Sequence, residues 1–308
     1  MVRKTPSLAR SDRAVTIRPR LPLGFLHDPS TFCQMGPVAR RRKVNRFSMV
    51  IRGGLALMNF VLPAMAAAGS GLPKGFVYLR DIDPTIVQDI RYAGSHNFVG
   101  RPIRGYLAAE CILSRPVARA LEAVQRKLAE KKLSLIVWDC YRPKRAVDDF
   151  LQWSKDPTHS EMKDEFYPRA DKETLFALGY LARRSAHSRG SAVDLGLVPS
   201  TFSPAPPPDP SQHLKACTSP KGERFEDGTI DFGTGHDCLD VLANTSSARV
   251  GSTALRNRQA LKSYMQGAGF RPYAREWWHF ELINEPFHRD GFDFEVSASP
   301  LWTERPTR

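Results

Sequence analysis

Two clusters of polar residues, far apart in the chain, carry the side chains best suited to chemistry. The first runs from Ser185 to Asp194 and places His187 and Asp194 on either side of a glycine-containing turn. The second is Glu276-Trp277-Trp278-His279. Two imidazoles and one carboxylate form a ligand set that leaves one position of a zinc ion open for water. We therefore predict one Zn²⁺ per chain, held by His187, Asp194 and His279.

Glu276 belongs to the second cluster but is not one of the three predicted zinc ligands. It is therefore a candidate general base. It would take a proton from a metal-activated water and pass that proton to the leaving amine. Residues 276 and 279 point to opposite faces of a regular strand, so this role requires a local bend or bulge. Alone, H-x6-D and E-x2-H are weak patterns in a chain with eight histidines. Scattered core and surface residues remain the alternative.

Arg142 follows a β-rich run, residues 133–138, which predicts an inner strand. Pro143 restricts Arg142 to an extended backbone and suits the first turn of a helix over about 144–153. Arg142 is then expected at a strand-to-helix junction, where it could stabilise the oxyanion formed when a carbonyl is attacked. A solvated surface arginine is the alternative.

Periodicity predicts the elements that would position these residues. In residues 191–197, Val193 and its apolar neighbours alternate with Asp194, which indicates a strand with Asp194 on the less apolar face. A helix to about residue 131 is expected after Ser114 as N-cap, with a core stripe of Val117, Leu121, Val124 and Leu128. Further strands are expected at 75–79 and 276–282, and further helices at 172–183 and 252–270.

The formal charge of +13 would suggest a nucleic-acid binder if it were spread over the chain. Residues 1–48, however, contain eleven Lys or Arg and two Asp, a net charge of +9, which leaves +4 for residues 49–308. The body shows no basic stripe interleaved with aromatic residues. We therefore expect no nucleic-acid partner.

The N-terminal region resembles an export signal. Arg40-Arg41-Arg42-Lys43 precedes a mostly apolar run that ends in small residues near Ala68. We interpret residues 49–68 as the hydrophobic region of a signal peptide and residues 1–48 as a basic extension, with the true start at Met35 or Met49. The expected location is periplasmic or secreted, with membrane contact through the export signal alone. An uncleaved anchor is the alternative, although the run is short for a membrane span.

Export would place four cysteines in an oxidising compartment: Cys111, Cys140, Cys217 and Cys238. Four cysteines allow three pairings. We favour Cys217–Cys238, which would close a loop and leave Cys111–Cys140, with four free thiols as the alternative. No CxxC spacing occurs, which argues against cysteine ligation of zinc.

The motifs in combination resemble the zinc D-Ala-D-Ala peptidase family. The stretches are Ser185-x-His187-x2-Gly190-x-Ala192-x-Asp194 and Glu276-Trp277-Trp278-His279-Phe280. Two more are similar to the D-alanyl-D-alanine dipeptidase (VanX-like) branch, namely Trp138-Asp139-x2-Arg142-Pro143, and Arg91-Tyr92-Ala93 followed by Asn97-Phe98-x-Gly100-x-Pro102-x2-Gly105-Tyr106. The resemblance spans about residues 76–282.

This resemblance implies an α+β fold, a single zinc peptidase domain with a central antiparallel sheet flanked by helices. We place that domain at residues 72–290, followed by a C-terminal tail at 291–308. It also implies hydrolysis of a small D,D-dipeptide, D-Ala-D-Ala, to two D-alanines, with His187, Asp194 and His279 as zinc ligands, Glu276 as base and Arg142 as transition-state stabiliser.

The resemblance also suggests substrate contacts. Ser185 and Tyr92 match pocket positions, Asp237 ends a Gly-Thr-x-x-Asp turn and could hold the substrate ammonium, and Tyr106 is a further candidate. The chain departs from the family pattern at His236, where an aromatic residue is expected, and in the longer segment between Asp194 and Asp237.

Two other functions fit the same residues. A peptidoglycan D,D- or L,D-carboxypeptidase would use the same zinc site with a groove for a long peptide, and residues 154–171 and 199–230 are expected to decide between groove and closed cavity. A non-catalytic, zinc-stabilised wall-binding domain would need neither Glu276 nor Arg142. The sequence leaves the oligomeric state open.

Overall fold

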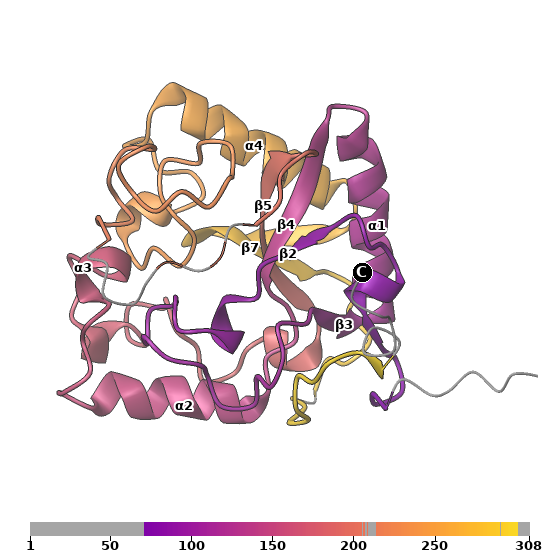
Figure 1. Ribbon diagram of the computed structural model, residues 1–308, viewed down its shortest axis with the longest axis horizontal. Helices are drawn as coiled ribbons and strands as arrows, with labels where there is room; N and C mark the ends of the chain where they lie inside the picture. The colour runs from indigo at the N-terminus through magenta and orange to yellow at the C-terminus, as the bar shows by residue number, and fades with distance from the viewer. Residues whose placement is uncertain (1–70, 205, 207, 209–213, 290, 301–308) are drawn as a thin grey trace, which may run out of the picture. The chain divides into compact units, whose positions relative to one another are not determined.

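The strand β4 (Leu133–Asp139) is an inner strand of a five-stranded sheet, as its run of apolar residues predicts. The strand order is β2-β4-β5-β7-β6 (Figure 1). The others are β2 (Val87–Gln88), β5 (Ala192–Pro199), β6 (Phe270–Tyr273) and β7 (Glu276–Leu282). β2 runs parallel to β4, and every other pair is antiparallel. The expected α+β class is confirmed.

The structure, a computed structural model, describes residues 71–204, 206, 208, 214–289 and 291–300. The expected basic extension and signal peptide therefore lie outside the described residues. Within the described part, no helix combines the length and apolar character needed to cross a membrane.

Helices cover the sheet. α1 (Arg115–Ala129) packs against β4, and α4 (Ser252–Gln266) packs against β6 (Figure 1). The predicted stripe of α1 is in the core, since Val117, Leu121, Val124 and Leu128 are at most 1% exposed. α2 (Lys144–Lys155) follows Pro143 as expected, and a short α3 (Lys163–Phe166) lies further along. Single 3₁₀ turns occur at Leu79–Asp81, Arg91–Ala93, Lys172–Thr174, His187–Arg189 and Val241–Ala243.

The prediction of a helix over residues 172–183 is wrong. Only Lys172–Thr174 forms a 3₁₀ turn. Gly179 then takes a φ of +79°, a left-handed conformation that a continuous helix does not allow, and the Tyr180 N–H donates back to the Leu175 carbonyl. The apolar spacing reflects loop packing instead, because Leu175 and Leu181 are buried while Leu178 is 42% exposed. This loop borders the site described below.

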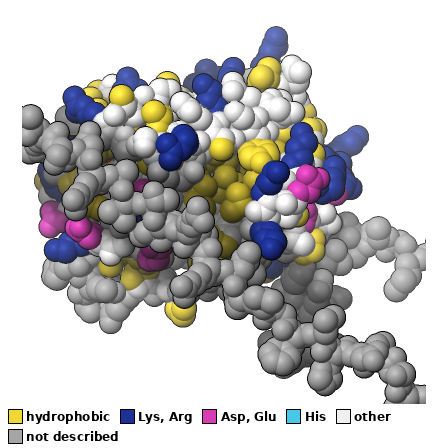
Figure 2. Space-filling model, turned by 90° about the horizontal axis from the view of Figure 1, so that it is seen from above, with side chains coloured by type: hydrophobic (Ala, Val, Ile, Leu, Met, Phe, Trp, Pro, Cys, Tyr) yellow, Lys and Arg dark blue, Asp and Glu magenta, His cyan; other side chains and the backbone are white. Residues whose placement is uncertain are grey.

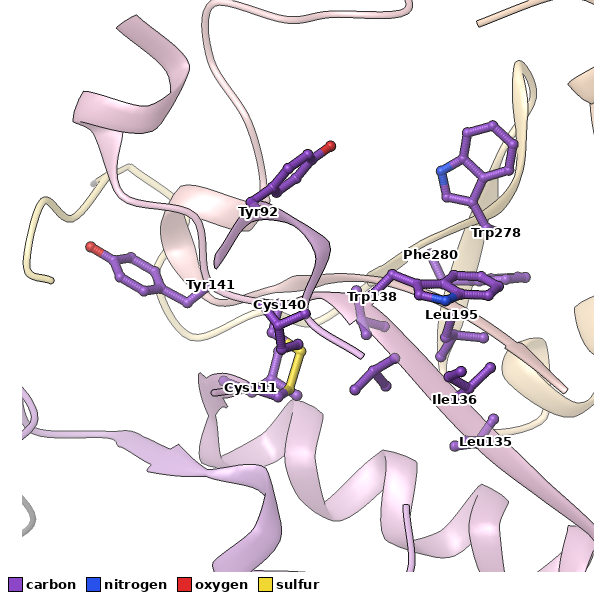
Figure 3. Packing of buried hydrophobic residues seen from close by; sticks show 14 of the residues in the cluster. Tyr92, Cys111, Leu135, Ile136, Trp138, Cys140, Tyr141, Leu195, Trp278 and Phe280 are labelled. Atoms are coloured by element: carbon purple, nitrogen blue, oxygen red, sulfur yellow. A yellow bond between two sulfur atoms is a disulfide. The ribbon is translucent and has the colours of Figure 1, made fainter. Parts of the chain in front are cut away.

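Buried residues of the neighbouring strands β4, β5 and β7 form part of the hydrophobic core. Figure 3 shows Leu135 and Ile136 of β4 close to Leu195 of β5 and Phe280 of β7. Both favoured disulfides are present: Cys111–Cys140, with 5.3 Å between Cα atoms, and Cys217–Cys238, with 5.5 Å. The first lies beside the same core (Figure 3).

A second, two-stranded sheet pairs β1 (Phe76–Tyr78) antiparallel with β3 (Ile112–Ser114). The described part of the expected C-terminal tail packs near it. Val296 is fully buried and forms a parallel bridge with Tyr106, and the Phe294 ring stacks on Tyr141 with centroids 3.9 Å apart. The C-terminal segment therefore forms part of the same core.

Basic side chains are scattered over the face shown in Figure 2. There, Lys and Arg are separated by hydrophobic and uncharged surface.

Candidate metal centre and active site

His187, Asp194 and His279 come together as a group of buried ligand atoms within 4.8 Å of one another. His279 Nδ1 lies 3.0 Å from Asp194 Oδ1 and 3.2 Å from His187 Nε2, and His187 Nε2 lies 3.3 Å from Asp194 Oδ2. Ligand atoms at about 2.0–2.2 Å from a tetrahedral zinc ion are separated by about 3.3–3.6 Å. The donor set and its spacing therefore fit such an ion.

The sheet brings Asp194 and His279 together. They are directly paired residues of β5 and β7. As the alternation predicts, Asp194 follows Val193 on the opposite face of β5, and Val193 pairs with Phe280. The strand argument for Asp194 is therefore confirmed.

The 3₁₀ turn His187–Arg189 positions the third candidate ligand, His187. Gly190 ends this turn with a φ of +63°, and a Cβ there would lie 2.4 Å from the Phe76 ring. Backbone bonds tie the turn to the Arg142 segment, because the Arg142 N–H donates to the His187 carbonyl at 3.1 Å. Gly190 therefore allows both the turn and its close approach to β1.

Each histidine has a partner on its other ring nitrogen. His187 Nδ1 donates to the Cys140 carbonyl at 2.7 Å, which leaves Nε2 free to face a metal. His279 Nε2 lies 3.4 Å from Glu281 Oε1, and Glu281 also binds Arg271. Such partners fix the ring orientation and tautomer of a ligating histidine.

The bulge that the general-base role of Glu276 requires is present in β7. Pro272 of β6 pairs with Phe280, but the next residue, Tyr273, pairs with Glu276, so β7 has extra residues at this point. The irregularity brings Glu276 Oε2 to 3.9 Å from His279 Nδ1. Burial raises the pKa of Glu276 to about 8, with the charges of Asp194 and Asp237 adding to the effect.

Burial alone would raise the pKa of Asp194, but the adjacent histidines outweigh it and hold that pKa well below its usual range. Burial opposes the charge on His279, but hydrogen bonds to Asp194 and Glu281 raise its pKa to about 10. The ligand cluster therefore holds a proton in the absence of a cation.

Arg142 reaches the cluster from the predicted junction. Its guanidinium binds Asp139 Oδ2 at 2.8 Å and lies 3.6 Å from Asp194 Oδ2. Asp139 is fully buried, and the Tyr106 hydroxyl donates to its other oxygen at 2.5 Å. Tyr106 thus lies behind Arg142 and is not among the residues that line the catalytic cavity described next.

The cluster opens into a cavity of about 140 Å³, which we call the catalytic cavity. This is small beside the roughly 300–1,000 Å³ of pockets for drug-sized ligands. Its lining includes Glu276, Arg142, Ser185, Tyr92 and Asp237. Other lining residues come from the loop at 179–186, and none of the described residues in 154–171 or 199–230 contributes.

Tyr92 and Asp237 form one wall of the catalytic cavity. The Tyr92 hydroxyl donates to Asp237 Oδ2 at 2.9 Å. Burial raises the pKa of Asp237 to about 7, with a further contribution from Asp194. Ser185 Oγ accepts from the His187 N–H at 3.2 Å, so Ser185 also supports the ligand turn.

His236 takes the aromatic role that the family pattern led us to expect. Its ring stacks on Trp138 with centroids 4.4 Å apart and meets Trp278 edge-on. Burial holds the pKa of His236 well below its usual value. His236 lines a small neighbouring cavity and not the catalytic cavity, so this departure lies behind the pocket wall.

Sequence reasoning assigned no role to Asp139 or Glu281. Asp139 was visible only as part of the Trp138-Asp139-x2-Arg142 motif, without a partner. Glu281 is two residues from His279 and so projects from the same face of β7, which could have identified it.

Fold and site together define a metallopeptidase: an α+β domain with two histidines and an aspartate around one point, a carboxylate beside them and an arginine facing them. The chain belongs to the D-ala-D-ala dipeptidase family, whose model matches residues 73–204 and 216–297. The expected family is therefore confirmed.

Curated relatives described as D-alanyl-D-alanine dipeptidase come from several bacteria. The chain is 34% identical over 226 residues to one from Enterococcus faecalis, covering 73% of this chain and 100% of that protein. It is 35% identical over 222 residues to one from Streptomyces coelicolor, covering 72% and 98%. A more distant one from Escherichia coli is 28% identical over 225 residues, covering 72% and 93%.

Proposed function

We propose that this protein hydrolyses free D-alanyl-D-alanine to two D-alanines with one zinc ion. The observation that carries the proposal is the position of Glu276 beside the ligand group His187, Asp194 and His279, at a cavity of about 140 Å³. The family and its relatives support the substrate. The bound zinc would lower the pKa of a water towards about 7 and polarise the scissile carbonyl.

The protein's own side chains divide the remaining work. Asp237, held by the Tyr92 hydroxyl, receives the substrate ammonium. Arg142, oriented by Asp139, faces the carbonyl oxygen and stabilises its developing negative charge. Glu276 takes one proton from the attacking water and passes it to the leaving nitrogen, while the hydroxyl adds to the carbonyl carbon and the C–N bond breaks.

The size of the catalytic cavity favours a dipeptide over a wall peptide. A carboxypeptidase must hold many residues on the amino side of the scissile bond, next to Asp237 in this arrangement. Asp237 is 5% exposed and bonded to Tyr92, which leaves little room for a longer chain there.

The test is D-alanine release by zinc-loaded protein from D-Ala-D-Ala and from a pentapeptide ending in D-Ala-D-Ala, with EDTA-treated protein as control. We expect release from the dipeptide alone, and only with metal. Release from the pentapeptide would move the protein to the wall carboxypeptidases. No release from either substrate with zinc bound would refute the proposal.

We also propose that the protein acts outside the cytoplasm, where it would recover D-alanine from dipeptide released there. The export signal read at residues 40–68 and the two disulfides support this role.

A further inference from the structure

A second cavity, of about 260 Å³, adjoins the catalytic cavity, and five of its ten lining residues are Lys or Arg. The two cavities share Arg184 and Ser185. The lining cations are Lys144, Arg183, Arg184, Arg189 and Arg289, whereas Asp148 is the carboxylate among the described lining residues. We call this second cavity the basic annex.

Two of these cations have partners. Arg189 binds both carboxylate oxygens of Glu285, at 2.7 and 2.8 Å. Arg183 lies over the Phe176 ring. In contrast, Arg184, Arg289 and Lys144 are exposed and form no ion pair with a described residue. Like charges around one concave surface repel one another, and a bound anion relieves that repulsion.

The annex meets the catalytic cavity at Arg184 and Ser185, whereas Asp237 lines the catalytic cavity alone. On the proposed function, Asp237 holds the ammonium and the metal ligands hold the scissile carbonyl. Among the arginines that line the catalytic cavity, Arg142 is engaged by Asp139, while Arg184 forms no ion pair within the described part of the chain. Arg184 therefore suits the terminal carboxylate, and the next side-chain atoms of that residue would enter the annex.

We propose that the basic annex is a subsite for a second carboxylate. It would bind D-alanyl dipeptides whose C-terminal residue has an acidic side chain, with D-alanyl-D-glutamate as the probe. This inference rests on the proposed dipeptidase function and deepens it, because it names a second substrate class for the same site.

The test compares D-Ala-D-Glu with D-Ala-D-Gln, which has nearly the same shape but no side-chain charge. With zinc-loaded full-length protein at low salt, we expect kcat/KM to be about fivefold higher for the glutamate dipeptide, as several exposed ion pairs would give together. The ratio should fall towards one in Lys144→Gln and Arg289→Gln, which remove annex cations that do not line the catalytic cavity, and in 0.5 M NaCl. Arg119→Gln on α1 is the control, because Arg119 lines neither cavity and pairs with Glu122. This variant should keep the wild-type ratio.

The outcomes distinguish a failure of the annex proposal from a failure of the proposed dipeptidase function. Hydrolysis of D-Ala-D-Ala with a wild-type Glu/Gln ratio at or below one overturns the annex and leaves the dipeptidase intact. A ratio above one that neither Lys144→Gln nor Arg289→Gln lowers also overturns the annex proposal. No hydrolysis of any of the three dipeptides overturns both.

Discussion

Three buried carboxyl groups around the catalytic cavity differ in charge because their neighbours differ. Two histidines keep Asp194 ionised, whereas burial raises the pKa of Glu276 to about 8 and that of Asp237 to about 7. Such separation is typical of sites in which one group binds a metal and another moves protons. The residue types were readable from the sequence, but these environments were not, because they depend on burial and on contacts between distant segments.

Glu276 should be needed for turnover and not for metal binding. In Glu276→Gln we expect kcat to fall by about 10²–10⁴, because the amide cannot accept a proton from water. Zinc content, measured by mass spectrometry of the dialysed protein, should stay at one per chain. His279→Ala is the matched comparison, in which zinc content itself should fall. Equal zinc loss in both variants would make Glu276 a ligand.

The buried Asp237 carboxyl should lower the folding stability of the protein at neutral pH, although the proposed function needs it for substrate binding. Its pKa is about 7 when folded against a usual 3.8, so between about pH 4 and 7 the folded protein keeps a proton that the unfolded chain releases. Stability of the metal-free protein therefore falls as pH rises through this window. In Asp237→Asn this loss is absent, so we expect a higher Tm than wild type at pH 8, a much smaller difference at pH 4, and a raised KM for the dipeptide.

Thermal unfolding of both proteins with EDTA at the two pH values checks this. The exposed Asp164→Asn is the control, and its Tm should match wild type at both. A Tm difference for Asp237→Asn that does not change with pH would contradict the expectation.

At the scale of elements, the sequence predicted the strands better than the irregularities that make the site. The expected strand over 276–282 coincides with β7. The need for a bulge near Glu276 followed from strand geometry, but its position did not, because it depends on pairing with Tyr273. A second irregularity, between Val137 and Asp139 of β4, places Asp139 opposite Asp194 and had no signal in the sequence. Bulges often re-aim side chains beside active sites.

Over residues 172–183 the sequence predicted a regular helix that the structure does not form. Apolar residues at helical spacing suggested it, yet Gly179 interrupts it and Tyr180 turns back towards Leu175. Local periodicity could not reveal that this stretch lines a cavity, because its partners are the distant residues Tyr273 and Arg275. The Tyr273 hydroxyl donates to the Gly179 carbonyl, and the Arg275 side chain lies beside Gly179.

The two disulfides should support different parts of the site. Cys140 supplies the carbonyl that accepts from His187, and its disulfide holds it to Cys111. Cys238 directly follows Asp237, whose φ is +54°, and its disulfide holds it to Cys217. We expect Cys111→Ala/Cys140→Ala to weaken zinc binding about 10–100-fold, the range for lost ligand-orienting contacts. We expect Cys217→Ala/Cys238→Ala to raise KM with zinc affinity unchanged.

Zinc affinity from chelator competition and steady-state kinetics separate these effects, and each variant is the control for the other. Since losing a disulfide costs about 2–5 kcal/mol, circular dichroism must first show that both variants are folded. Equal losses of zinc affinity in the two variants would mean that the disulfides act through overall stability alone.

At the scale of the whole molecule, specificity depends on segments that sequence reasoning did not select. Residues 154–171 and 199–230 were expected to decide between cavity and groove, yet none of their described members lines the catalytic cavity. The boundary comes instead from the loop at 179–186 and from Tyr92, Asp237 and Leu239. Long polar or proline-rich segments draw attention in a sequence, but only the three-dimensional arrangement shows which segments meet the site.

The last prediction concerns export. The family match begins at residue 73, and the Enterococcus faecalis relative is covered over its whole length by 226 residues of this chain. The family match therefore lies entirely after the positive and apolar run that ends near Ala68, and that run suits removal by signal peptidase. Expressed in a Gram-negative host, the protein should appear in the periplasm with its N-terminus near Gly69. N-terminal sequencing checks this, and recovery of protein with residues 1–60 intact would refute export.

Thiol labelling of the same sample should find Cys111, Cys140, Cys217 and Cys238 all oxidised, because an oxidising compartment maintains disulfides that the cytoplasm would reduce.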